Sequence, residues 1–311
     1  MITRRDVDAA AARIAGQVRR TPVAEVDPGT FAGPSWLKCE FMQHTGSFKA
    51  RGAVNRILAA REAGELDPAV GVVVASGGNA GLANAYAARA LGVPATVFIP
   101  TTAPAVKVAK LRGYGAAVVQ HGVEYAEAYE AAVKHAADTA AVYCHAYDQP
   151  EIAAGAGTLA LELLNQIDGG VDTIVVAVGG GGLAAGVAAA AEGTAQVVGV
   201  EPQSIPTLHA ALANGGPVDV AVSGIAADTL GARRIGDIAY AVAVRTGVRP
   251  VLVTDEDLVV ARRLLWDHWR IAVEYGAAAA LAALTSGAYQ PQPGERIAVV
   301  LCGANTDPAG L

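Results

Sequence analysis

Residues 173–191 read TIVVAVGGGGLAAGVAAAA, and this stretch decides the fold. It carries no charge and is nearly long enough to cross a membrane. Four consecutive glycines in its middle, however, divide it into two parts. The part before them is rich in β-branched residues and fits a buried strand, whereas the part after them is rich in alanine and fits a helix. We therefore expect a strand, a tight turn and a helix here, and no membrane span.

Apolar strand-like runs alternate with helical stretches along most of the chain. The predicted strands are 35–40, 70–75, 95–99, 116–119, 141–143, 173–178, 196–201, 240–244 and 296–301. The predicted helices are 4–18, 53–63, 80–91, 104–112, 123–138, 151–167, 183–192, 255–270 and 274–285. The strands are too continuously apolar to have one wet face, so this alternation predicts an α/β fold of open parallel sheets with helices on both faces. No flexible linker marks a domain boundary.

Composition excludes several classes of protein. The 311 residues suffice for one large domain or two moderate ones, and 53% hydrophobic with 17% charged residues indicates a compact soluble protein. A net charge of −6, with basic residues at most in pairs, disfavours nucleic-acid binding. Cys39, Cys144 and Cys302 lack the spacing of a disulfide framework or a structural zinc site. The amino terminus has no apolar signal region, so we expect a cytoplasmic location and no membrane partner.

Lys49 lies in the stretch QHTGSFKARGA, residues 43–53, which is typical of a turn that runs into a helix. Ser47 is the predicted N-cap, which places Lys49 in the first helical turn. Positive potential from the helix dipole, the nearby Arg51 and any burial would all lower the pKa of the Lys49 amine. A partly neutral amine is what Schiff-base chemistry needs. The charge pattern alone fits a surface lysine in a poor helix position equally well.

A second candidate site is the stretch from Ser76 to Gly81, SGGNAG, where a strand enters a helix through small residues. Unhindered backbone N–H groups at a helix N-terminus can bind a carboxylate or a phosphate, and Asn79 adds a side-chain donor. A plain tight turn explains the motif alone equally well.

The four glycines 179–182 form a third candidate site, a phosphate cradle built on the same physics. This turn also supports a rival hypothesis, an NAD(P)-binding oxidoreductase. Gly180-x-Gly182-x-x-Ala185 fits the dinucleotide fingerprint, and Glu201 ends the next strand 21 residues after Gly180. That hypothesis leaves Lys49 and the Ser76–Gly81 turn unexplained. The fourth candidate, Cys302, follows a buried strand at the edge where α/β ligands bind, although an inert buried thiol fits its position better in isolation.

Taken in order, these stretches resemble the fold-type II pyridoxal-phosphate (PLP) enzymes, the two-domain fold of the tryptophan synthase β-subunit, and most closely the serine/threonine dehydratases. The match covers nearly the whole chain. Each motif alone is weak evidence for the family, but several of them in the right order are specific to it. The matching segments are Thr21-Pro22, 46–49 (GSFK), 76–81, 155–162 (GAGTLALE), 179–182, Val273-Glu274 and Cys302-Gly303.

The resemblance implies a PLP cofactor and a role for each candidate residue. Lys49 would form the Schiff base, Phe48 would pack on the cofactor ring, and Asn79 would bond its 3-hydroxyl. Cys302 would meet the pyridine nitrogen. Backbone amides of the phosphate cradle would come from Gly179, Gly180, Gly181, Gly182 and Leu183. The substrate carboxylate would be held by Ser76, Gly77, Gly78, Asn79 and Ala80. No metal is implied.

The resemblance also implies an activity and an architecture. We expect β-elimination of L-threonine or L-serine to 2-oxobutanoate or pyruvate plus ammonia. Residues 1–46 and 147–311 would form a large domain and residues 47–146 a small mobile one, with the cofactor between them. A homodimer is the family expectation. Two other reactions fit the same scaffold: β-replacement of the cysteine synthase type and dehydration of a bulkier hydroxyamino acid. A catalytically silent PLP-binding protein is a third alternative, and the intact motifs make it the least favoured one.

Departures from the family pattern refine these expectations. Serine racemases carry a serine where this chain has Gly77, so we expect no racemisation. A divalent-cation site needs an acidic residue where this chain has Thr207, and Glu201 alone is a weak ligand set. His44 and Tyr275 replace the usual Arg and Pro near the expected cleft, which leaves the substrate open. The sequence ends at Leu311 without a regulatory domain, so isoleucine should not affect threonine turnover.

Overall fold

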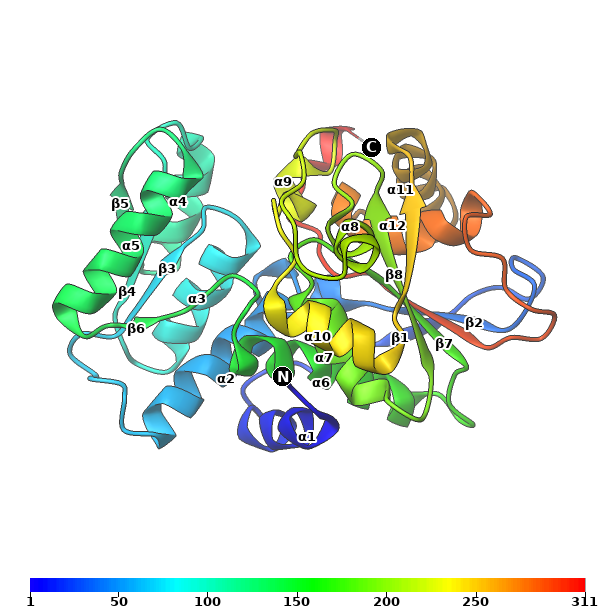
Figure 1. The fold of residues 1–311 in the computed structure, drawn as a ribbon, viewed down its shortest axis with the longest axis horizontal. Coiled ribbons are helices and arrows are strands. Elements are labelled where there is room, and N and C mark those ends of the chain that lie inside the picture. The colour runs from blue at the N-terminus through cyan, green and yellow to red at the C-terminus, as the bar shows by residue number, and fades with distance from the viewer. Residues whose placement is uncertain (311) are drawn as a thin grey trace.

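The computed structural model describes residues 1–310, which form two β-sheets flanked by helices (Figure 1). The larger sheet has the order β1-β2-β10-β7-β8-β9, and only β1 runs antiparallel to its neighbour. The smaller sheet has the order β5-β4-β3-β6 and is wholly parallel. The strands are β1 Val23–Glu25, β2 Ser35–Lys38, β3 Val72–Ala75, β4 Ala95–Ile99, β5 Ala117–Gln120, β6 Val142–Tyr143, β7 Thr173–Ala177, β8 Gln196–Pro202, β9 Arg249–Val253 and β10 Ile297–Val300. The predicted α/β class is confirmed.

Helices cover both faces of each sheet, as Figure 1 shows. The α-helices are α1 Arg4–Arg13, α2 Lys49–Glu62, α3 Asn79–Ala90, α4 Ala105–Gly113, α5 Tyr125–Thr139, α6 Pro150–Gln166, α7 Gly182–Ala191, α8 Thr207–Asn214, α9 Ala227–Leu230, α10 Asp237–Thr246, α11 Asp255–Trp269 and α12 Tyr275–Thr285. Short 3-10 helices span Glu40–Met42, His44–Gly46 and Pro308–Gly310. None of the helices in the described part of the chain combines the length and hydropathy that crossing a bilayer requires.

The smaller sheet shows why its strands do not alternate between apolar and polar residues. Val72 and Val74 of β3 point into a cluster with α2, α3 and α4, while Val73 and Ala75 pack with α5 on the other face. All four side chains are buried. A parallel strand that is covered on both faces must be apolar at every position.

Helix α2 lies between the two sheets and packs on α6 and α3 (Figure 1). A buried charge network fixes its start. Arg51 Nε lies 2.8 Å from Glu40 Oε2, and Arg51 Nη1 lies 2.7 Å from Glu162 Oε1 of α6. Lys38 of β2 completes the network at 2.8 Å from Glu162. The first turn of α2 is therefore tied to the larger sheet and to α6.

The predicted strand 240–244 is wrong, because these residues lie inside helix α10. Its buried residues Ala239, Val242 and Ala243 follow a helical spacing, and Val244 is exposed. The strand that joins the sheet is β9, which begins after Gly247 ends the helix in the left-handed region. A short apolar run does not distinguish a buried strand from a helix by periodicity. Strand β1 was not predicted, and α1 ends earlier than expected.

Candidate active site

The predicted site residues gather where strands end. The Ser76 turn follows β3, the four glycines follow β7, and Cys302 follows β10. Strands β10 and β7 are parallel neighbours, so Cys302 and the glycine turn lie at the same edge of the larger sheet. The carboxyl edge of an open parallel sheet is the usual ligand-binding edge in α/β proteins.

Lys49 lies in the first turn of a helix, as predicted; it is the first residue of α2, and its side chain is half-buried. Its amine donates a hydrogen bond of 2.6 Å to the carbonyl of Ala146 and lies 5.1 Å from the centre of the Phe48 ring. Burial lowers the pKa of Lys49 to about 8, while the nearby Cys302 and Glu274 act in the opposite direction. A substantial fraction of this amine is therefore neutral at slightly alkaline pH, as a nucleophile requires.

Ser47 and Arg51 do not have the roles that the sequence predicts for them beside Lys49. Ser47 is not a side-chain cap: its backbone is extended and bridges to Gly303, and its buried hydroxyl has no hydrogen-bond partner among the described residues. Arg51 does not contribute to the lowered pKa of Lys49, because the carboxylates of Glu40 and Glu162 compensate its charge. The pKa of Lys49 is lowered by desolvation of its amine and not by the charge repulsion that was expected from Arg51.

The glycine turn forms an anion site at the start of α7. Gly181 has a φ of 86°, and a Cβ on Gly180 would lie 2.4 Å from the ring of Tyr147. Within residues 1–310, the backbone N–H groups of Gly180, Gly181, Gly182 and Leu183 donate to no protein acceptor. Unpaired N–H groups at a helix N-terminus can bind an anion, so this turn fits the phosphate of PLP.

Gly179 also belongs to this turn, and its carbonyl accepts a hydrogen bond of 2.6 Å from Thr207 Oγ1. The same hydroxyl lies 3.0 Å from Glu201 Oε1.

The surroundings of Glu201 test the dinucleotide-binding alternative. The Glu201 carboxylate is buried and also accepts hydrogen bonds from the backbone of Leu208 and His209 at the start of α8. The Glu201 carboxylate therefore caps helix α8. It is not free to bind a ribose hydroxyl, which is the role of the acidic residue in the dinucleotide fingerprint.

The Ser76 turn has a similar geometry at the start of α3. Ser76 Oγ accepts a hydrogen bond from the N–H of Gly78 at 3.2 Å. The N–H groups of Asn79 and Ala80 have no acceptor among the described residues. A Cβ on Gly81 would lie 1.9 Å from the carbonyl oxygen of Ser76, so the close turn requires glycine there. The turn can bind a carboxylate through these amides.

Asn79 belongs to a polar network that sequence reasoning missed. Its Nδ2 donates to Glu274 Oε1 at 2.8 Å, and its Oδ1 accepts from Asn305 Nδ2 at 2.7 Å. Glu274 Oε2 also accepts from the backbone of Asn305 at 3.2 Å. Burial raises the pKa of Glu274 to about 7. Gly303 permits this contact, because a Cβ there would lie 2.5 Å from Glu274 Oε1.

Cys302 is buried next to this network, and its backbone carbonyl accepts from the N–H of Phe48 at 3.0 Å. Desolvation raises the pKa of the Cys302 thiol, so the side chain stays neutral. The neutral thiol fits the partner that the resemblance expects for the pyridine nitrogen. The two departures from the family pattern lie elsewhere: His44 stacks on Tyr86, and the Tyr275 ring lies under Arg262.

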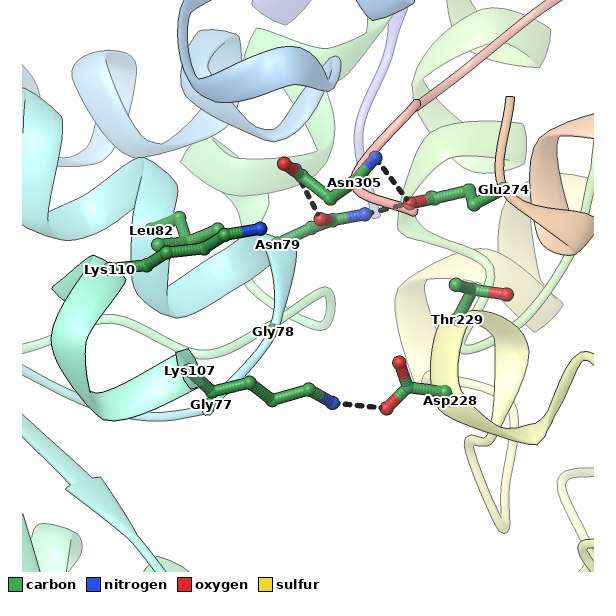
Figure 2. Close-up of a pocket in the computed structure, with 10 residues that line it drawn as sticks. All are labelled: Gly77, Gly78, Asn79, Leu82, Lys107, Lys110, Asp228, Thr229, Glu274 and Asn305. Carbon is green, nitrogen blue, oxygen red and sulfur yellow. Dashed lines mark hydrogen bonds and ion pairs between the residues drawn. The ribbon is translucent and has the colours of Figure 1, made fainter. Parts of the chain in front are cut away.

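A cavity opens beside the Ser76 turn (Figure 2). Helices α3 and α4 form one wall, and α9 with the segments around residues 274 and 305 forms the other. Its lining residues are Gly77, Gly78, Asn79, Leu82, Lys107, Lys110, Asp228, Thr229, Glu274 and Asn305. Of the predicted site residues, only Gly77, Gly78 and Asn79 line this cavity. The other polar and charged lining residues were not predicted as site residues, although Glu274 belongs to the Val273-Glu274 pair of the family resemblance. These residues are Lys107, Lys110, Asp228, Thr229, Glu274 and Asn305.

Comparison with known proteins defines the class. Residues 14–303 match the family described as "Pyridoxal-phosphate dependent enzyme", and the chain belongs to this family. A phenylserine dehydratase from Ralstonia pickettii is 37% identical over 308 residues, 96% of this chain and 91% of that protein. An L-threonine ammonia-lyase from Thermotoga maritima is 34% identical over 312 residues, 99% of this chain and 76% of that protein. The protein is a PLP-dependent enzyme.

Relatives of similar identity carry other activities. An L-threo-3-hydroxyaspartate ammonia-lyase from a Pseudomonas species is 35% identical over 309 residues, 97% of this chain and 95% of that protein. The solved structure of maize serine racemase superimposes with a TM-score of 0.92 at 30% identity, covering 99% of this chain and 95% of that chain. These comparisons establish the family and the fold and leave the substrate open.

Proposed function

We propose that the protein is a PLP-dependent ammonia-lyase that converts L-threonine or L-serine to 2-oxobutanoate or pyruvate and ammonia. The observation that carries the proposal is the Lys49 amine, with its pKa lowered to about 8, at the sheet edge that also holds the glycine turn and Cys302. The similarity to an L-threonine ammonia-lyase supports the same reaction class.

Each group has a chemical role in this proposal. When bound, PLP supplies an electron sink for the electron pair that remains when the Cα proton leaves. The backbone amides from Gly180 to Leu183 would hold its phosphate, and Lys49 would be its attachment point. The neutral thiol of Cys302 would face its pyridine nitrogen and would not supply the charge that a carboxylate supplies there.

Lys49 is also the proton acceptor once the substrate amine has replaced it. Its low pKa matches this task, because an acceptor works best when its pKa is near the working pH. The Ser76–Ala80 turn orients the substrate through its carboxylate, and the amide of Asn79 is held in place by Glu274 and Asn305. We further propose that the units 1–46 with 147–311 and 47–146 close on the substrate, which excludes water from the reacting atoms.

Racemisation is the alternative that the serine racemase similarity raises. It requires a second group that exchanges a proton on the opposite face of Cα. Gly77 occupies the position where racemases carry serine, and it has no side chain to do this. We therefore propose that oxo acid forms without D-serine, and a chiral assay of the serine reaction measures both products.

The first test is the absorbance spectrum of the purified holoenzyme before and after borohydride, with the Lys49→Ala variant beside it. We expect a visible band that borohydride abolishes and that the variant lacks. Ammonia release from threonine and serine should fall by about three orders of magnitude or more in the variant, because it loses both the attachment point and the proton acceptor. A wild-type protein that shows no such band after incubation with PLP would contradict the proposal.

A further inference from the structure

The α4 wall of the cavity carries two lysines one helical turn apart. Lys107 forms an ion pair with Asp228 of α9 on the opposite wall. Lys110 has no carboxylate within ion-pair distance among residues 1–310, although it lines the same cavity. Figure 2 shows its side chain extended with the amine directed toward Asn79. The ammonium group of Lys110 is thus a solvent-exposed positive charge without a protein carboxylate beside it, at the cavity that adjoins the Ser76 turn.

The carboxylates that line the cavity are already engaged. Asp228 pairs with Lys107. Glu274 accepts hydrogen bonds from Asn79 and from the backbone of Asn305, and it is buried. No protein carboxylate is therefore placed to neutralise Lys110, and an anion from solution or from a substrate can do so.

The rest of the lining distinguishes between kinds of substrate side chain. Leu82 is the one large apolar side chain among the ten residues that line the cavity, and the others are glycines or polar and charged residues. A phenyl ring needs apolar surface to displace water favourably, and this lining offers little. A second carboxylate instead finds Lys110 next to the turn that is proposed to bind the first one.

We infer that Lys110 binds a second carboxylate on the substrate, so that the site accepts 3-hydroxy amino acids with a carboxylate on Cβ, such as 3-hydroxyaspartate. This inference rests on the proposed function. In the reaction, the Cα–H and Cβ–OH bonds break and water leaves. One water then hydrolyses the released enamine, so that the net products are oxaloacetate and ammonia. The Ser76–Ala80 turn holds one end of the substrate and Lys110 holds the other.

Binding to the holoenzyme tests the subsite without turnover. L-malate and L-lactate lack the reactive amine, and malate differs from lactate by one carboxylate on C3. We expect calorimetry to show malate binding about 10-fold or more tighter than lactate to the wild type, because a charge-assisted hydrogen bond is added. The Lys110→Met variant should lose this preference. Arg112→Met should keep it, because Arg112 is an exposed residue of α4 that does not line the cavity.

Equal affinity of the wild type for malate and lactate would overturn the inference, as would the same loss in both variants. Kinetics separate it from the proposed function. We expect Lys110→Met to reduce kcat/KM for 3-hydroxyaspartate about 10-fold more than for threonine. If threonine or serine is consumed and 3-hydroxyaspartate is not, the inference fails and the proposed function stands. If malate binds through Lys110 but no amino acid releases ammonia, the proposed function fails and the subsite stands.

Discussion

The amine of Lys49 donates a hydrogen bond of 2.6 Å to the carbonyl of Ala146, 97 residues further along the chain. Lys49 starts α2, and Ala146 lies in the segment between β6 of the smaller sheet and α6. The reactive amine is thus held by the segment that returns the chain from the smaller sheet to the larger one. Its burial at this junction lowers its pKa, and this has a measurable consequence.

The apoprotein should bind PLP with a pH dependence set by Lys49. The neutral amine is the nucleophile, and its pKa is lowered to about 8 from 10.5. Below pH 8 the rate constant for attachment should rise about tenfold per pH unit, and above it the rate should level off. Stopped-flow absorbance measures this rate, with Lys49→Ala as the blank. A rate that still climbs tenfold per unit up to pH 10 would show an amine with an ordinary pKa.

The same shift predicts how the stability of the apoprotein varies with pH. The folded state releases the Lys49 proton near pH 8, whereas the unfolded chain keeps it until about 10.5. Between these values the unfolded state binds more protons, so this residue makes stability rise with pH. Denaturant melts at pH 7.5 and 10 should show a larger rise for the wild type than for Lys49→Met. A smaller rise in the wild type would contradict the assigned direction.

Gly303 should be essential for the position of Asn79. A Cβ at this residue would lie 2.5 Å from Glu274 Oε1, so Gly303→Ala should displace the carboxylate that holds Asn79. We expect kcat to fall about 10-fold, in keeping with the loss of one positioned hydrogen bond. Gly216→Ala is the matched control, because a Cβ there meets nothing within 4 Å. Steady-state kinetics that do not distinguish the two variants would refute this role.

Arg51 should stabilise the fold strongly. Arg51→Met leaves the Glu40 carboxylate buried without its 2.8 Å partner, and breaking such a pair from one side costs about 3–5 kcal/mol. The exposed pair of Lys134 and Asp138 provides the control, since Lys134→Met should change the free energy of unfolding by about 0.5 kcal/mol or less. Urea unfolding measures both variants. A similar loss of unfolding free energy in the two variants would mean that the buried Arg51 network stabilises the fold no more than an exposed ion pair does.

Gly77 should be the residue that withholds racemisation. A Cβ at Gly77 meets only Ile99 Cγ2, at 3.5 Å, which is ordinary van der Waals contact, so the backbone position accepts a side chain. We expect Gly77→Ser to form D-serine from L-serine, because it adds a hydroxyl that can exchange a proton. Gly77→Ala adds the same Cβ without the hydroxyl and should form none. A chiral assay that detects no D-serine with Gly77→Ser would show that further groups are required.

Local patterns were sufficient for most elements and for the motifs of the site. The strand–turn–helix at 173–191 and the turn before α3 were predicted from apolar runs and glycines, and Lys49 was placed in the first turn of a helix, although the predicted range 53–63 begins four residues after the start of α2. The strand at 240–244 was not, because five apolar residues suit a buried helix as well as a strand. Only the packing of Val242 and Ala243 into the larger core decides between them.

The sequence by itself determined the α/β class, the glycine-rich turns after β3 and β7 and the family, because each depends on residues that are close together in the chain. Only the tertiary structure brought Glu274 and Asn305 to Asn79, from 195 and 226 residues away, and set Lys110 beside the Ser76 turn. It also decided the state of Lys49. Its pKa falls because packing removes water from the amine, while Glu40 and Glu162 compensate Arg51, and burial and charge pairing of this kind exist only in the folded chain.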